Sequence, residues 1–246
     1  MIRGIVLDKD GTLVDFRSLW DGVGRALASE FLRLAGIPYD GVLEAELSGS
    51  IGVLPGGLDP GGAFASGTYA QCGDRFVRTL SRFGFAYDAK AAATILAAVS
   101  DRAVCGKNAR YVPTCDLRSL FSRLRRLSVK TALVTADTQL SAEYAADRLA
   151  FRGLIDFLAG ATDSEPPKPD GAAIDRFCAE FGLSRENVAV VGDTPTDMRF
   201  ARNAGAIAVG VLSGVSTRKT LAPLADYVID HAGRLPALVL SLKERR

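Results

Sequence analysis

The stretch that decides the fold reads IVLDKDGTL, residues Ile5 to Leu13. Its apolar run ends in two carboxylates spaced i, i+2, and a glycine and a threonine follow at once, which is typical of a buried strand that opens into a tight loop. Residues i and i+2 at a strand end lean the same way, so Asp8 and Asp10 should converge on one small volume. An ordinary Asx turn, which also combines Asp with a following Gly, is an alternative for this segment taken alone.

Two carboxylates at such a strand end suit the binding of a metal and a phosphate. They repel each other unless a cation or a proton lies between them. Mg²⁺ bound through oxygens would keep Asp8 ionised, and a proton on Asp10 would make that residue a general acid. Gly11 lets the backbone approach a ligand closely, and the N–H groups that follow, at Thr12 and beyond, can point at phosphate oxygens.

Polar residues suited to the same chemistry occur at three later places in the chain. A second apolar run ends in Thr135, whose hydroxyl can donate to a phosphate oxygen. Lys168 lies between prolines, which restrict the backbone and can aim its charge. A third apolar run, 188–192, is followed by the carboxylates Asp193 and Asp197. The order and position of these groups favour one site over a set of unrelated turns.

The alternation of strand and helix patterns after residue 112 predicts an α/β fold. It implies right-handed crossovers and a doubly wound, mostly parallel sheet, with ligands bound beyond the carboxyl ends of the strands. The predicted strands are Gly4 to Leu7, Lys130 to Thr135, Ile155 to Ala159, Val188 to Gly192, Ile207 to Leu212 and Tyr227 to Ile229.

The segment 17–107 has helical periodicity and no convincing strand, so it is predicted to be inserted into the α/β fold. Within it, the stretch 49–73 is rich in glycine and proline and predicts a long irregular segment, either functional or a disordered surface loop. Helices are predicted over Leu19 to Leu34, Arg75 to Phe83 and Ala89 to Val104.

Composition is that of an ordinary soluble enzyme. The chain has 246 residues, of which 48% are hydrophobic. Its net charge of +2 argues against the strong positive potential that nucleic-acid-binding proteins use. No apolar stretch has the length of a membrane span, and Asp8 and Lys9 interrupt the first apolar run, so we expect no signal peptide. The four cysteines form no C-x-x-C pair, which argues against zinc and disulfides and favours the cytoplasm.

With these motifs in place, the chain resembles the haloacid dehalogenase-like hydrolase superfamily, and within it the capped phosphatases similar to phosphoglycolate phosphatase. The resemblance covers the core almost end to end. It implies a Rossmann-like core domain, residues 1–16 and 109–246, with an inserted helical cap domain, residues 17–108. The motifs that carry it are Asp8 to Leu13, Thr135, Lys168 and Gly192 to Asp197.

The resemblance also implies a role for each motif residue. Asp8 would be the nucleophile and Asp10 the acid and base, while Asp8, the carbonyl of Asp10 and Asp193 would hold Mg²⁺. Asp197 would orient Lys168 or a metal-bound water. Lys9 stands where many relatives carry an apolar residue, and we expect it to leave the Asp-x-Asp pattern untouched. The expected phosphate-binding residues are Gly11, Thr12, Thr135, Ala136 and Lys168.

The predicted function is magnesium-dependent hydrolysis of a small phosphate monoester through an aspartyl phosphate. A phosphomutase or another phosphotransferase of the superfamily is an alternative, although such relatives carry a cap histidine and the single histidine here, His231, lies outside the insertion. A receiver-like signalling protein, which needs about half this length, and a non-catalytic phosphate-binding protein are further alternatives. The expected partner is a small phosphorylated metabolite, with no nucleic acid or membrane, and the expected state is a monomer or homodimer.

Overall fold

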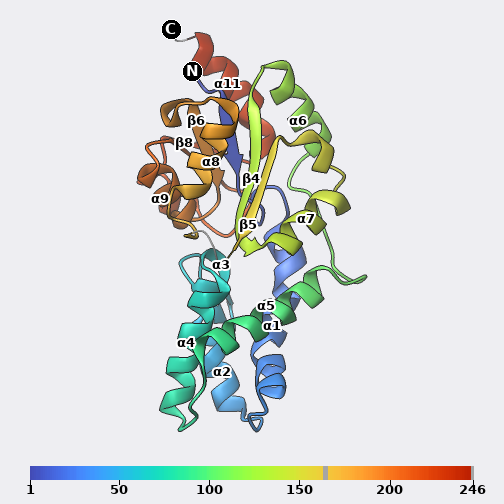
Figure 1. Ribbon diagram of the computed structural model, residues 1–246, viewed down its shortest axis with the longest axis vertical. Helices are drawn as coiled ribbons and strands as arrows, with labels where there is room; N and C mark the ends of the chain where they lie inside the picture. The colour runs from blue at the N-terminus through green and yellow to red at the C-terminus, as the bar shows by residue number, and fades with distance from the viewer. Residues whose placement is uncertain (163–165, 245–246) are drawn as a thin grey trace. The chain divides into compact units, whose positions relative to one another are not determined.

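Within the residues described by the computed structural model, 1–162 and 166–244, six parallel strands form one sheet in the order β5-β4-β1-β6-β7-β8 (Figure 1). The order runs outward from β1 in both directions, as in a doubly wound α/β fold, so the predicted fold class is confirmed. The strands are β1 Gly4–Leu7, β4 Lys130–Thr138, β5 Phe157–Ala161, β6 Val188–Gly192, β7 Ile207–Val211 and β8 Tyr227–Ile229.

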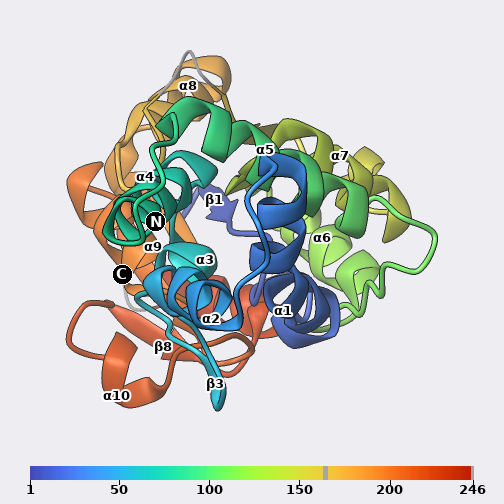
Figure 2. The ribbon, with the colours of Figure 1, turned by 90° about the horizontal axis from the view of Figure 1, so that it is seen from below.

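Helices cover both faces of this sheet because its strands are apolar on both sides. Ile5 and Leu7 of β1 belong to one buried cluster and Val6, between them, to a second cluster on the opposite face. Figure 2 shows α6 and α7 on one side of β1 and α8 and α9 on the other. The helices of this unit are α6 Leu117–Arg126, α7 Gln139–Arg148, α8 Ala172–Phe181, α9 Pro195–Asn203, α10 Arg218–Leu221 and α11 Leu235–Glu244, with short 3₁₀ turns at Arg152–Leu154, Arg185–Asn187 and Ala232–Arg234.

The predicted strands agree with the observed ones except along β4, β5 and the end of β7. β4 continues three residues past the predicted end at Thr135, because pairing with β5 resumes at Thr138 after a register shift. β5 is shifted by two residues at both ends, running over Phe157–Ala161 instead of the predicted Ile155 to Ala159. β7 ends at Val211, one residue early.

The chain divides into two compact units, residues 1–16 with 111–246 and residues 17–110. The second junction lies two residues from the boundary expected from the sequence. The unit 17–110 has its own apolar core, to which Phe31, Leu47, Phe76 and Leu96 contribute. Its elements are α1 Phe16–Ala35, α2 Gly41–Ser50, β2 Val53–Leu54, β3 Gly57–Leu58, α3 Ala63–Ser66, α4 Tyr69–Arg82 and α5 Ala89–Val104.

The prediction of a long irregular segment over 49–73 is wrong. The segment contains the β2–β3 hairpin, α3 and the start of α4. Thr68 caps α4 through a reciprocal capping box with Gln71, which starts the helix six residues before the predicted Arg75. Gly73, which reads as a helix breaker, lies inside α4 because a Cβ there would lie 2.7 Å from the carbonyl oxygen of Ala89 in α5. Because Gly73 has no side chain, α4 and α5 can pack closely at this position.

None of the helices in the described part of the chain has both the length and the apolarity needed to cross a membrane.

Candidate active site

Three neighbouring strands bring the predicted site residues to one edge of the sheet. Asp8 follows β1, Thr135 lies near the end of β4 and Asp193 follows β6, and β1 pairs with both β4 and β6. Because the strands are parallel, their carboxyl ends meet at the same edge. Residues separated by more than a hundred positions in sequence thus become neighbours.

Lys168 joins this group from the loop that precedes α8. Its Nζ donates to Asp8 Oδ1 at 2.7 Å and to Asp197 Oδ1 at 2.9 Å. Burial alone would lower the pKa of Lys168, but the charges of Asp197 and Asp8 outweigh burial and raise that pKa. Lys168 is therefore a buried permanent cation that touches Asp8.

Asp197 is fixed in the first turn of α9. Thr194 is the N-cap of α9, Pro195 follows it, and Asp197 Oδ2 accepts the Thr194 N–H at 3.1 Å and its hydroxyl at 2.7 Å. The other oxygen accepts from Lys168. Asp197 thus contacts Lys168, which is one of the two arrangements expected from the sequence.

Asp8, Asp193 and Asp197 form an acidic cluster in which one carboxylate oxygen of each lies within 4.8 Å of the others. Burial, with smaller contributions from Asp197 and Asp10, raises the pKa of Asp8 to about 7 even though Lys168 opposes the shift. Burial and the charges of Asp8 and Asp197 raise the pKa of Asp193 well above its usual value. Such a cluster attracts a cation, because bringing buried carboxylates together is unfavourable without one.

Two features of Asp193 fit a bound divalent cation. Oδ2 accepts the N–H of Val215 at 2.7 Å, whereas Oδ1 is buried and has no hydrogen-bond partner among residues 1–162 and 166–244. A Cβ at Gly11, which has a φ of +80°, or at Gly214 would collide with this carboxylate. These glycines therefore let the backbone pack closely against the Asp193 carboxylate, whose Oδ1 is left unsatisfied, and oxygen ligands are those that Mg²⁺ prefers.

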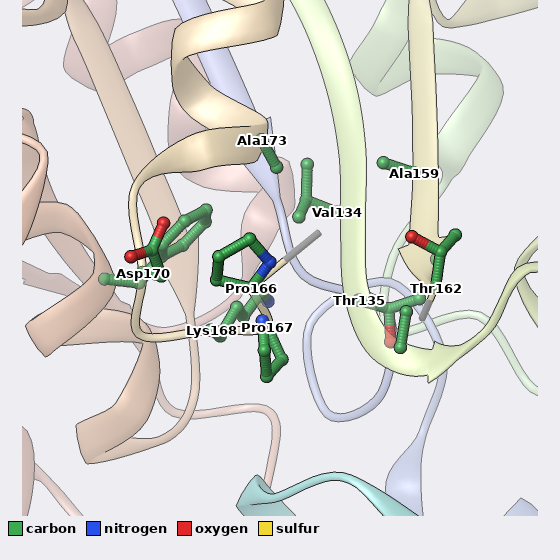
Figure 3. A pocket seen from close by; sticks show the side chains of 12 residues that line it. Val134, Thr135, Ala159, Thr162, Pro166, Pro167, Lys168, Asp170 and Ala173 are labelled. Atoms are coloured by element: carbon green, nitrogen blue, oxygen red, sulfur yellow. The ribbon is translucent and has the colours of Figure 1, made fainter. Parts of the chain in front are cut away.

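Thr135 and Lys168 line one small cavity on the β4 side of the site (Figure 3). Thr135 and Thr162 lie on one side of it, with Pro166, Pro167 and Lys168 across from them. The cavity measures about 20 Å³, which is room for about one water molecule. It can therefore hold a water or one small group.

The hydroxyl of Thr135 is set up as a donor. Its Oγ1 accepts the backbone N–H of Asp137 at 3.2 Å, so its own proton is directed elsewhere. A register shift in the β4–β5 pairing spans residues 134–138, and such a bulge re-aims side chains. The neighbouring Ala136 is half-buried in this stretch.

The remaining predicted phosphate contacts lie in the loop after β1. Gly11 and Thr12 are both buried there. The carbonyl of Gly11 accepts from the Ser213 hydroxyl at 2.7 Å, and the carbonyl of Thr12 accepts from the Thr114 hydroxyl at 2.6 Å. These bonds fix the loop at two consecutive residues.

Lys9 leaves the Asp-x-Asp pattern intact, and its side chain contacts the second aspartate of that pattern. Its side chain is fully buried, and its Nζ lies 3.0 Å from Asp10 Oδ2. The same nitrogen donates to Asp137 Oδ2 at 2.7 Å and to Ser141 Oγ at 2.8 Å. Sequence reasoning passed over Asp137, near the end of β4, and Ser141, in the first turn of α7.

The sequence is similar to those of two bacterial enzymes. A phosphoglycolate phosphatase of Chromobacterium violaceum is 27% identical over 112 residues, 46% of this chain and 50% of that protein. A candidate pyrophosphatase, PpaX, of Caldanaerobacter subterraneus subsp. tengcongensis is 28% identical over 130 residues, 52% of this chain and 59% of that protein. The chain thus matches between half and three fifths of the length of these relatives.

The fold is also similar to solved structures. The crystal structure of a predicted phosphoglycolate phosphatase from Haemophilus somnus 129pt has a TM-score of 0.71 with 18% identity, covering 97% of this chain and 98% of that one. At this identity the likeness shows the fold alone.

The family inferred from the motifs is confirmed by a match over most of the sequence. The sequence model of the haloacid dehalogenase-like hydrolases matches residues 2–205, a range that holds Asp8, Asp10, Thr135, Lys168 and Asp193. The chain belongs to the haloacid dehalogenase-like hydrolase family.

Proposed function

We propose that this protein is a magnesium-dependent phosphatase that hydrolyses a small phosphate monoester through an aspartyl phosphate on Asp8. The observation that carries the proposal is the contact of Lys168 with Asp8 at 2.7 Å beside the acidic cluster of Asp8, Asp193 and Asp197. The cluster suits a divalent cation, and the lysine suits a phosphate oxygen. Together they surround a carboxylate that is placed to act as nucleophile.

Magnesium would be held by the carboxylates of Asp8 and Asp193 and by the backbone carbonyl of Asp10. When bound, it offsets the negative charge of both the nucleophile and the phosphate. Without such help, a carboxylate and a phosphate charge about 4 Å apart repel by roughly 4 kcal/mol at an effective dielectric of about 20. The unsatisfied Oδ1 of Asp193 supports this ligand set.

The side chains divide the chemistry between them. Lys168 orients Asp8 and neutralises one phosphate oxygen, while the Thr135 hydroxyl and the N–H groups near Gly11 and Thr12 bind others. Asp8 attacks phosphorus as the bond to the leaving oxygen breaks, and Asp10 gives its proton to the departing alcohol. Asp10, now ionised, takes a proton from the water that hydrolyses the aspartyl phosphate. The products are an alcohol and inorganic phosphate.

The names of the relatives support the substrate class. One is named for a phosphate monoester, phosphoglycolate, and another for pyrophosphate, and both compounds are small phosphorylated molecules. We place the substrate of this chain in the same class. In this proposal the unit 17–110 is the cap expected from the sequence and contributes to substrate choice.

Hydrolysis of p-nitrophenyl phosphate tests the proposal. We expect turnover with Mg²⁺, its loss in EDTA, and its recovery when Mg²⁺ is restored. Asp8→Asn should lower kcat by at least about 10³-fold, because the amide is a poor nucleophile. Asp230→Asn is the control, since Asp230 has 66% of its side chain exposed and lies outside the site. Full activity of Asp8→Asn would overturn the proposal.

A further inference from the structure

A second buried lysine lies beside the second aspartate of the first motif. Lys9 is fully buried, and its ammonium group contacts Asp10 Oδ2, Asp137 Oδ2 and Ser141 Oγ at 3.0, 2.7 and 2.8 Å. The ammonium group donates to Asp137 and Ser141 and forms an ion pair with Asp10. A buried ammonium group needs such partners, because an unpaired charge in the interior is strongly unfavourable.

The partners of Lys9 are themselves held in place. Asp137 Oδ2 also accepts the Ser141 hydroxyl at 2.5 Å, and its Oδ1 accepts the Thr138 N–H at 2.8 Å. Thr138 caps α7 by accepting the Ser141 N–H. Asp137 and Ser141 are therefore fixed to the end of β4 and the start of α7, independently of the loop that carries Asp10.

We propose that Lys9, held by Asp137 and Ser141, is a positioning residue that fixes the carboxyl group of Asp10 for proton transfer to the leaving group. The inference rests on the proposed phosphatase function and deepens it. Asp137 balances the charge of Lys9, so this pair is neutral as a whole and Asp10 can lie beside it with or without its proton. Lys9 then acts through orientation rather than through contact with substrate.

The geometry assigns the two oxygens of Asp10 different tasks. Oδ2 forms the ion pair with the ammonium group of Lys9, so it is the anchored oxygen. Oδ1 is then the oxygen that holds the proton. As the bond between Asp8 and phosphorus forms and the bond to the leaving oxygen breaks, this proton passes from Oδ1 to the leaving oxygen. The water of the second step returns a proton to the same atom.

A leaving-group series separates this role from a merely structural one. p-Nitrophenolate departs without protonation, whereas phenoxide and above all an alkoxide need the proton of Asp10. We would measure kcat/KM, which covers the steps up to the first phosphoryl transfer, for p-nitrophenyl phosphate, phenyl phosphate and glycerol 3-phosphate. Lys9→Met should lose about 100-fold on glycerol 3-phosphate but less than about 5-fold on p-nitrophenyl phosphate, with phenyl phosphate between them.

Matched variants control for folding and charge. Lys130→Met removes an ammonium group that is 47% exposed and pairs with Asp156, and it should change all three substrates equally and little. Ser141→Ala keeps the charges of Lys9 and Asp137 and removes one acceptor of Lys9. Its losses in kcat/KM should rank the three substrates in the same order as those of Lys9→Met, but each loss should be smaller. Because Lys9→Met leaves Asp137 without its cation, Ser141→Ala also serves as the deciding variant where Lys9→Met fails to fold.

The outcomes distinguish the role of Lys9 from the proposed phosphatase function. Losses that grow with the basicity of the leaving group support the role of Lys9. Equal losses on all three substrates in a folded Lys9→Met, or in Ser141→Ala where Lys9→Met does not fold, overturn that role and leave the phosphatase proposal standing. A wild-type protein without magnesium-dependent activity on any substrate overturns both.

Discussion

Two buried lysines each serve one of the two aspartates at the end of β1. Lys168 contacts Asp8 and Asp197, and Lys9 contacts Asp10 and Asp137. In both cases burial alone would lower the pKa of the lysine, and the two carboxylates more than offset it, so the pKa is raised. The nucleophile and the proton carrier proposed here are thus oriented by separate cations, which lets their positions be tuned separately.

Replacement of Lys168 should affect catalysis and stability together. Lys168→Met removes the charge that faces the phosphate, so kcat should fall by about 10²- to 10³-fold. It also leaves Asp8 and Asp197 without their cation, so the free energy of unfolding in EDTA should fall by about 3 kcal/mol, measured by urea denaturation. Lys130→Met, an exposed lysine, should change stability by less than about 1 kcal/mol. Unaltered kcat in Lys168→Met would contradict the assignment.

The aspartates were predictable from the sequence and the partner of Asp10 was not. Asp8, Asp10, Lys168, Asp193 and Asp197 stand in short motifs, each directly after an apolar run or between prolines. A lysine in a loop is ordinarily solvent-exposed, and its burial depends on an acceptor pair more than a hundred residues away. The contact of Lys9 with Asp137 and Ser141 arises only in the folded sheet, so no local sequence pattern predicts it.

At the scale of elements, the end of β4 determines much of the site. The register shift between Val134 and Thr138 spans both Thr135, which lines the cavity, and Asp137, which accepts from Lys9. Three strands were predicted to the residue, because their apolar runs end sharply: β1, β6 and β8. The extension of β4 was missed, since it depends on the pairing of Thr138 with Ala161 of β5, and a partner strand is not visible in the sequence of β4.

The opposite end of the same strand pair allows a pH-dependent prediction. Asp156 accepts from Lys130 Nζ at 2.9 Å and from the Thr131 N–H at 2.9 Å. Burial alone would raise the pKa of Asp156, but these hydrogen bonds outweigh it, so the pKa lies below the usual value of 3.8. A lowered pKa in the folded state contributes stability that is present above the unfolded value and lost as the pH falls through the folded one.

Asp156→Asn should therefore lower the free energy of unfolding by about 1 kcal/mol at neutral pH. The difference from the wild type should shrink as the pH falls below about 4, where the wild-type carboxylate takes up a proton. Urea denaturation across this pH range measures it, with Asp230→Asn as the exposed control. A difference that stays constant down to the acid limit of folding would show that the charge of Asp156 is not responsible.

At the scale of the whole molecule, the strand order brings the site together. β4, β1 and β6 are the middle of the sheet, and their carboxyl ends place Thr135, Asp8 and Asp193 side by side. A doubly wound, mostly parallel sheet was predictable from the alternation of strands and helices. The internal structure of the unit 17–110 was only partly predictable, because its hairpin and short α3 are held by packing rather than by periodic sequence.

Magnesium should stabilise the folded protein through this edge of the sheet. A ligand that binds only the native state at about 100 times its Kd adds about 2.7 kcal/mol, which for a chain of this size corresponds to a rise in Tm of about 5 °C. Asp193→Asn should abolish the rise, because it removes a carboxylate from the acidic cluster. Thermal unfolding with Mg²⁺ or EDTA measures the effect, and Ca²⁺ serves as a competing oxygen-seeking cation. An equal rise in Asp193→Asn would place the cation elsewhere.

The central claim is that Asp8 carries the phosphoryl group, and trapping the intermediate tests it most directly. The wild-type protein would be mixed with substrate and Mg²⁺, quenched, and reduced with borohydride, which converts an aspartyl phosphate to homoserine. Peptide mass spectrometry should then find homoserine at position 8 alone, and none after treatment without substrate. Homoserine at Asp10 or Asp193, or none anywhere in a protein that is turning over substrate, would contradict the account.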